Sequence, residues 1–181
     1  MRILVLEDDM SRRDAMQACL EDRFAQYPVD YFATAPEMIR ALESLDLQNV
    51  ILISLDHDLE LLVHSDGTMI DSGDGVDVAR WLSEREPTCP VIVHTTNTIG
   101  GDRMMALLDE AGWPVSRVVP YDDTRWIAER WRELVREAIV HGADYAVSVS
   151  EPNCPAQPVE QVANDARHQS HASSDRSSRA G

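Results

Sequence analysis

The sequence predicts an α/β protein whose parallel β-sheet is covered by helices on both faces. Two observations support this fold class. Strand-length apolar runs alternate with helical patterns through residues 1–147, which gives five βα units. The strand-length runs are also almost wholly apolar, as expected for strands of a parallel sheet that is buried on both sides. In such sheets ligands bind at the carboxyl ends of the strands.

The five predicted strands are short apolar runs bounded by polar residues. They lie at residues 2–6, 29–33, 49–55, 90–94 and 115–119. The first predicted helix runs from about residue 12 to 24. The second follows a capping box formed by Thr34 and Glu37, with Pro36 in its first turn. The remaining helices are predicted at about 75–86, at about 102–111 with Gly112 as the stop, and from 122 to about 140.

Residues 148–181 differ in composition from the rest of the chain. They are rich in Ser, Pro, Gln and Ala and show no apolar period, so they cannot bury enough surface to offset the entropy of ordering. We therefore expect one domain at 1–147 and a disordered tail at 148–181. His168 and His171 in that tail are expected to be solvated. Residues 60–74 form an unusually long link after the third strand, and ordered long links are often functional.

The charge of the chain is strongly negative. It has 32 acidic and 16 basic residues, a net charge of −16, and every basic residue is an arginine. Such a chain would not bind nucleic acid over an extended surface, so a phosphate must be held locally by a metal, backbone amides or a few arginines. Three cysteines form neither a disulfide framework nor a zinc pattern, and neither a leader peptide nor a membrane-length apolar run is seen. These features favour a cytoplasmic location.

Polar side chains follow four of the five predicted strands. They are Glu7–Asp9, Asp56–Asp58, His94–Asn97 and residues 120–123. Because the ends of parallel strands meet at one edge, we expect these groups to surround a single crevice. Clustered carboxylates raise one another's pKa unless a cation compensates, and oxygen ligands suit Mg²⁺ or, at some sites, Mn²⁺. The alternative is that Glu7–Asp9 only cap the next helix.

Several of these segments resemble a response-regulator receiver domain. The likeness rests on "RILVLEDDMSRRDAM", on "ISLDHDL", on "CPVIVHTT" and on "RVVPYDD". It implies a flavodoxin-like three-layer sandwich with strand order 2-1-3-4-5, Glu7 and Asp8 as the acidic pair, Asp56 as phosphoacceptor and Thr95 as the hydroxyl residue. The family's essential lysine falls on Val119, and the chain has no lysine to replace it. An arginine such as Arg103 or Arg125 could take that place.

Two histidines distinguish the chain from an ordinary receiver. His57 follows Asp56, and His94 precedes Thr95; "LDHDL" and "HTTNTIGGDRMM" resemble the divergent cyclic-phosphate-processing receiver-like domains. The resemblance implies a phosphoesterase for a cyclic, 2′,3′-type, or terminal phosphate, borne by a small molecule or a nucleic-acid end. His57 and His94 suit acid/base catalysis beside Asp56.

The remaining predicted roles concern the metal and the phosphate. The predicted metal ligands are Glu7, Asp8 and Asp56, with Asp58 either completing the metal site or orienting His57. The predicted phosphate-binding groups are Thr95, Asn97, the backbone of Gly100 and Gly101, and Arg103. The alternatives are that "IGGD" is simply a loop before a helix and that Arg103 is solvated. The second functional hypothesis is an atypical, non-enzymatic receiver that regulates a partner protein.

Overall fold

The computed structural model describes residues 1–63 and 69–140. The predicted tail at 148–181, the predicted domain boundary at 147, His168 and His171 lie outside the described residues. The central sheet has five parallel strands in the order β2-β1-β3-β6-β7. The strands are β1 (Arg2–Leu6), β2 (Val29–Phe32), β3 (Val50–Leu55), β6 (Val91–His94) and β7 (Val115–Val118). This order is the 2-1-3-4-5 arrangement that the sequence predicted.

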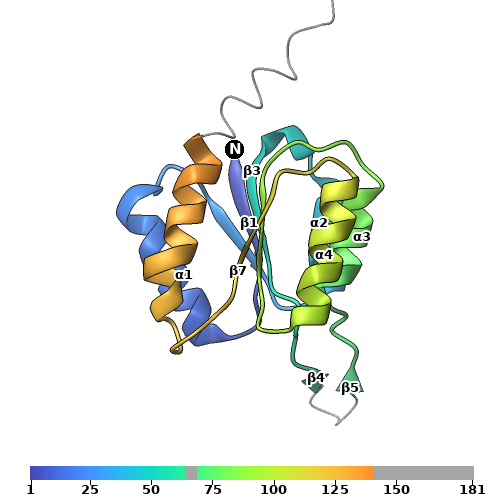
Figure 1. Ribbon diagram of the computed structural model, residues 1–181, viewed down its shortest axis with the longest axis horizontal. Coiled ribbons are helices and arrows are strands. Elements are labelled where there is room, and N and C mark those ends of the chain that lie inside the picture. Colours follow the sequence, from blue (N-terminus) through green and yellow to red (C-terminus); the bar gives the residue numbers. More distant parts are fainter. Residues whose placement is uncertain (64–68, 141–181) are drawn as a thin grey trace, which may run out of the picture. The chain divides into compact units, whose positions relative to one another are not determined.

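Helices cover both faces of the sheet (Figure 1). They are α1 (Met10–Arg23), α2 (Ala35–Ser44), α3 (Gly75–Ser83), α4 (Thr98–Glu110) and a last helical stretch at 125–140 that contains the π-helical segment η2 (Ile127–Trp131). A short 3₁₀ helix, η1 (Leu47–Asn49), leads into β3. The helix α1 and the last helix pack on one face, whereas α2, α3 and α4 pack on the other.

The core consists of two buried layers, one on each side of the sheet. Alternate strand residues face opposite sides, so Leu4 and Leu6 join the layer under α2–α4 while Ile3 and Val5 join the layer under α1. All six residues of β3 are buried because this strand is in the middle of the sheet. The position of β3 brings the residue that follows it, Asp56, to the centre of one sheet edge.

The helix starts show which sequence signals were correct. Thr34 caps α2 by accepting a hydrogen bond from the amide of Glu37, as the capping pattern predicted. The predicted start of the fourth helix at residue 102 was wrong, because α4 begins at Thr98. The Asn97 side chain accepts a hydrogen bond from the amide of Gly100 and so nucleates the helix four residues earlier. Gly100 and Gly101 therefore lie in a first helical turn.

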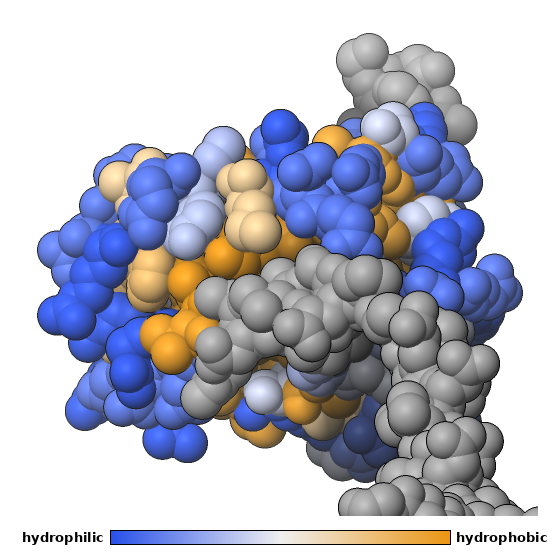
Figure 2. Space-filling view, turned by 90° about the horizontal axis from the view of Figure 1, so that it is seen from above, coloured by the Kyte–Doolittle hydropathy of each residue, from blue (hydrophilic) through white to orange (hydrophobic). Residues whose placement is uncertain are grey.

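The link after β3 contains regular structure that the sequence did not indicate. It forms a small antiparallel pair, β4 (Leu62–Val63) with β5 (Met69–Ile70), at the edge of the sheet where the strands end (Figure 1). Figure 2 views the opposite edge, where the strands begin; hydrophilic residues cover much of its rim and hydrophobic residues lie between them. Among the helices of the described residues, none has the length and apolar character needed to cross a bilayer.

Candidate functional site

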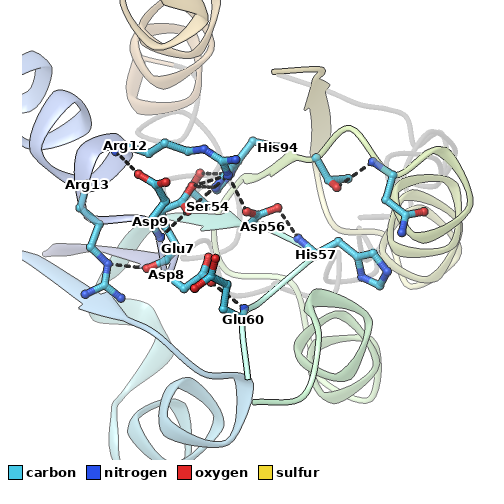
Figure 3. Close-up of polar contacts among 12 residues, drawn as sticks. Glu7, Asp8, Asp9, Arg12, Arg13, Ser54, Asp56, His57, Glu60 and His94 are labelled. Atoms are coloured by element: carbon cyan, nitrogen blue, oxygen red, sulfur yellow. Dashed lines mark hydrogen bonds and ion pairs between the residues drawn. The ribbon is translucent and has the colours of Figure 1, made fainter. Parts of the chain in front are cut away.

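Three titratable side chains meet at the carboxyl edge of the sheet (Figure 3). Glu7 follows β1, Asp56 follows β3 and His94 ends β6, three strands that are neighbours in the sheet. One ligand atom from each lies within 4.8 Å of the others, and all three residues are buried. Burial of two carboxylates and an imidazole is unfavourable unless charges compensate. We call these residues the Glu7–Asp56–His94 cluster.

The imidazole of His94 is oriented by contacts from distant parts of the chain. Its Nδ1 lies 3.0 Å from Ser54 Oγ, which also accepts a hydrogen bond from Trp131 Nε1 at 3.0 Å. The ring of Trp126 stacks on it, with ring centroids 5.7 Å apart. These contacts aim Nε2 at Glu7 Oε2, 3.4 Å away, in an electrostatic contact that is not aligned as a hydrogen bond. Nε2 thus has no hydrogen-bond partner among the described residues.

Arg12 supplies the positive charge next to the cluster. From the first turns of α1, its NH1 lies 3.0 Å from Asp56 Oδ2 and 3.4 Å from Glu7 Oε1. Sequence reasoning had offered Arg103 or Arg125 for this role. Arg103 is exposed on α4, and Arg125 is exposed and pairs with Glu129 at 2.7 Å. Val119, at the receiver's lysine position, is 53 % exposed. Arg12 is therefore the basic residue in contact with the cluster, and the sequence analysis did not single it out.

The two carboxyl groups respond differently to burial. Burial raises the pKa of Asp56 to about 6, although electrostatic interactions with His94 and Arg12 oppose that rise. Burial alone would also raise the pKa of Glu7, but contacts with His94, the Asp9 amide and Arg12 outweigh it and lower that pKa. Asp56 is therefore ionised at neutral pH although burial disfavours its negative charge. An additional cation at the cluster would relieve this penalty.

Two of the predicted metal ligands lie outside the cluster. Asp8 accepts a hydrogen bond from the amide of Glu60 at 2.6 Å, which ties the start of α1 to the link after β3. Asp58 accepts a hydrogen bond from Asn97 Nδ2 at 3.0 Å. The part of the chain described here contains one group of three ligand residues within metal-binding reach, and it comprises Glu7, Asp56 and His94. His94 belongs to this group, whereas Asp8 and Asp58 do not.

The side chain of His57 points away from the Asp56 carboxylate (Figure 3). Its ring packs against Gly100, where a Cβ atom would come within 2.0 Å of His57 Cδ2. Its Nε2 lies 3.8 Å from Asp58 and its Nδ1 lies 4.0 Å from Asp74. The His57 side chain is 13 % exposed, whereas that of His94 is 0 % exposed. The acid/base roles of both histidines remain predictions.

The predicted phosphate-binding groups at the start of α4 are engaged within the fold. The amides of Gly100 and Gly101 donate to the side chain and the carbonyl of Asn97, respectively. Thr95 Oγ1 is buried and accepts a hydrogen bond from the amide of Asn97. A Cβ on Gly101 would come within 2.4 Å of the guanidinium of Arg117. This segment therefore has a sufficient structural explanation, and its phosphate role remains a prediction.

A pocket of about 620 Å³ adjoins the cluster on the side of Arg12. Its walls come from the start of α1 and from the segments after β6 and β7, and they are Asp9, Ser11, Arg12, Thr96 and residues 120–124. Asp122 and Asp123 there have positive φ angles of 47° and 49°, a strained conformation that is frequent at functional sites. Arg12 is the sole basic residue in a wall with three aspartates. A phosphate group would need further positive charge to enter.

Comparison with known proteins identifies the family of the domain. The family model described as "Cyclic-phosphate processing Receiver domain" matches residues 3–110. The chain belongs to this family of receiver domains. No relative was found among the curated proteins.

Solved structures similar to this domain are themselves receiver domains. The phosphorylated cyanobacterial phytochrome response regulator RcpA is 14 % identical with a TM-score of 0.58, covering 77 % of this chain and 94 % of its own. A signal receiver domain from Pseudomonas fluorescens Pf-5 is 16 % identical with a TM-score of 0.56, covering 80 % and 90 %. The beryllofluoride-activated NtrC4 receiver domain is 22 % identical with a TM-score of 0.54, covering 78 % and 98 %. At these identities the likeness shows the fold.

Proposed function

We propose that this receiver domain is a metal-assisted phosphoesterase that hydrolyses a cyclic phosphodiester of the 2′,3′ type. The observation that carries the proposal is the buried Glu7–Asp56–His94 cluster beside Arg12 and an open pocket. A plain receiver needs a carboxylate that can be phosphorylated and a lysine that reads the phosphoryl group. Here the lysine is replaced by Val119, and a buried imidazole is aimed at the carboxylates instead.

Hydrolysis of a cyclic phosphodiester adds one water molecule across one P–O bond. The water oxygen bonds to phosphorus, the bond to one ribose oxygen breaks, and that oxygen takes up a proton, so the product is a phosphomonoester. The reaction requires neutralisation of the phosphoryl charge and in-line positioning. A divalent cation held by Glu7, Asp56 and His94 would supply positive charge at the phosphoryl oxygens. The donor set fits such an ion because it combines two carboxylates with an unpartnered imidazole nitrogen.

Arg12 is proposed to hold the phosphate. Its guanidinium lines the pocket and contacts Asp56, so it can exchange one carboxylate partner for a phosphoryl oxygen without leaving α1. The pocket wall described above contains no histidine. Proton transfer by His57 would therefore require its ring to turn from Gly100 toward the substrate.

The first test is phosphorus NMR of the full chain with adenosine 2′,3′-cyclic phosphate. With Mn²⁺ or Mg²⁺ present we expect a phosphomonoester signal that is lost when EDTA is added. The position of the new signal shows whether the 2′ or the 3′ bond breaks. An unchanged spectrum from a chain that demonstrably binds metal would contradict the proposed activity.

Arg12→Gln and Arg103→Gln form a matched pair for the phosphate-binding role. We expect Arg12→Gln to raise KM by about 10- to 100-fold, the value of a hydrogen bond to a charged group. Arg103→Gln should leave KM unchanged because Arg103 is exposed on α4. The reverse ranking would return the phosphate site to the start of α4.

One observation favours a second function, that of an atypical receiver. The 3.0 Å contact from Arg12 to Asp56 places a positive charge where a phosphorylated aspartate would need one. Acetyl phosphate with Mg²⁺ would then give a stable acyl phosphate on Asp56, detected by mass spectrometry and absent in Asp56→Asn. The enzyme proposal expects no stable modification and continued turnover of the cyclic substrate.

A further inference from the structure

The structure assigns His94 a role that sequence reasoning did not give it. We propose that the Glu7–Asp56–His94 cluster is a mixed nitrogen–oxygen metal site, with His94 Nε2 as a ligand, that prefers a first-row transition-metal ion such as Mn²⁺ to Mg²⁺. The inference rests on the proposed function in that it concerns the metal of the same site. Its test does not depend on turnover.

The first argument is the direction of the unpartnered nitrogen. His94 is 0 % exposed, so solvent cannot satisfy Nε2, and Nε2 has no hydrogen-bond partner in the described ranges 1–63 and 69–140. It faces Glu7 Oε2 at 3.4 Å and lies within 4.8 Å of a ligand atom of Asp56. Buried polar atoms in proteins are normally satisfied, and a nitrogen aimed at two carboxylates completes a donor set that suits a cation.

The second argument is the network behind the ring. An indole N–H can only donate, so Ser54 Oγ accepts from Trp131 Nε1 and retains a second lone pair for His94. When Nδ1–H donates to that lone pair, the neutral ring presents its free electron pair at Nε2, toward Glu7 and Asp56. A ring nitrogen fixed by a hydrogen bond on its far side is the usual arrangement of metal-binding histidines.

The third argument is the backbone that positions Trp131. Trp131 is the last residue of η2, a π-helical turn within the last helix. Single π-helical turns are rare and occur frequently at functional sites. The indole reaches Ser54 across 77 positions in the sequence, through a fully buried contact. Trp131 and Ser54 are thus positioning residues for His94.

The donor chemistry decides which metal is preferred. Mg²⁺ is a hard ion that takes oxygen ligands and retains water, whereas imidazole suits first-row transition metals. A site with only Glu7, Asp8, Asp56 and Asp58 would have matched Mg²⁺. With the imidazole nitrogen of His94 in place of the carboxylates of Asp8 and Asp58, the metal preference of the site moves toward Mn²⁺, Fe²⁺ or Zn²⁺. In the absence of metal, Arg12 neutralises the carboxylates, with its side chain 33 % exposed at the rim.

The test uses the metal-free full chain titrated with Mn²⁺ and separately with Mg²⁺ by calorimetry. We expect wild type to bind Mn²⁺ more tightly than Mg²⁺. His94→Gln should weaken Mn²⁺ binding by on the order of 10- to 100-fold or more, with little change for Mg²⁺. His57→Gln is the matched control and should bind both ions as wild type does, because its ring lies outside the cluster. Equal affinities of wild type for the two ions would overturn the proposal.

Electron spin echo envelope modulation on the Mn²⁺-loaded chain reports the ligand directly. We expect modulation from a coordinated ¹⁴N nucleus in wild type and in His57→Gln, and its loss in His94→Gln. Wild type without ¹⁴N modulation, or modulation that persists in His94→Gln, overturns the proposal. If His94→Gln does not fold, the wild-type spectrum still shows whether a nitrogen coordinates Mn²⁺. Ser54→Ala then tests whether that nitrogen belongs to His94, because loss of the Ser54 contact should free the ring and alter the modulation. A clear ¹⁴N signal without hydrolysis of cyclic nucleotides would contradict only the proposed activity.

Discussion

The Glu7–Asp56–His94 cluster and the start of α4 both looked functional in the sequence, but their polar groups are satisfied to very different degrees. At the start of α4, Asn97 caps the helix and the glycines make room for His57 and Arg117. In the cluster, Asp56 is ionised against its environment and His94 Nε2 has no hydrogen-bond partner in the described residues. Two polar segments at one sheet edge can thus have different roles. The start of α4 stabilises the fold, whereas the cluster contains polar groups whose burial is unfavourable until a ligand binds them.

Removing the Asp56 charge should stabilise the metal-free protein. The folded-state pKa of Asp56, about 6, is above the usual 3.8, so ionisation of this carboxyl group destabilises the folded protein. The stability that the protonated carboxyl group allows is fully present below about pH 4 and is lost as the pH rises through about 6. We expect Asp56→Asn to raise the free energy of unfolding by about 3 kcal/mol at about pH 8, and by about half as much at about pH 5. Urea unfolding in EDTA at the two pH values measures this.

The control for that prediction is Asp58→Asn. The Asp58 side chain is 58 % exposed, and an asparagine can still accept the hydrogen bond from Asn97. It should show no pH-dependent gain in stability. A loss of stability in Asp56→Asn at about pH 8 would mean that the cluster is already satisfied without a cation.

Gly100→Ala should act on the start of α4 alone. Its Cβ would overlap the His57 ring, so we expect a loss of about 2 kcal/mol in the free energy of unfolding. Mn²⁺ affinity should be unchanged, because the ligand residues lie elsewhere. Gly101→Ala should cost less, since its Cβ meets the flexible end of Arg117. Loss of metal binding in Gly100→Ala would show that the two regions are not independent.

Asn97→Ala should have the smallest effect. Loss of the N-cap should cost about 1 kcal/mol in thermal or urea unfolding, and Asn97→Asp should recover most of it. Turnover of the cyclic substrate could instead fall strongly in Asn97→Ala and stay low in the equally stable Asn97→Asp. The Asn97 amide would then be a phosphate ligand, which would contradict a purely structural role for the start of α4.

The sequence predicted the strands because buried parallel strands appear as short, continuous apolar runs, and the resemblance to receiver domains implied their order. The sequence also predicted that Glu7, Asp56 and His94 lie at one edge of the sheet, because parallel strands end there, and the structure brings these residues together. It missed Arg12, because which side of α1 faces the cluster depends on how that helix packs. That Asp8 and Asp58 lie outside the cluster could not be predicted from sequence. Only the folded chain shows Asp8 bound to the Glu60 amide and His94 turned inward by Ser54 and Trp131.

Anomalous diffraction from crystals of the full chain soaked in Mn²⁺ would test the central claim most directly. We expect an anomalous peak at the manganese edge among Glu7, Asp56 and His94 Nε2, with Arg12 drawn away from Asp56. A peak on Asp8 or Asp58 instead, with His94 Nε2 still facing Glu7, would contradict the assignment of His94 as a metal ligand.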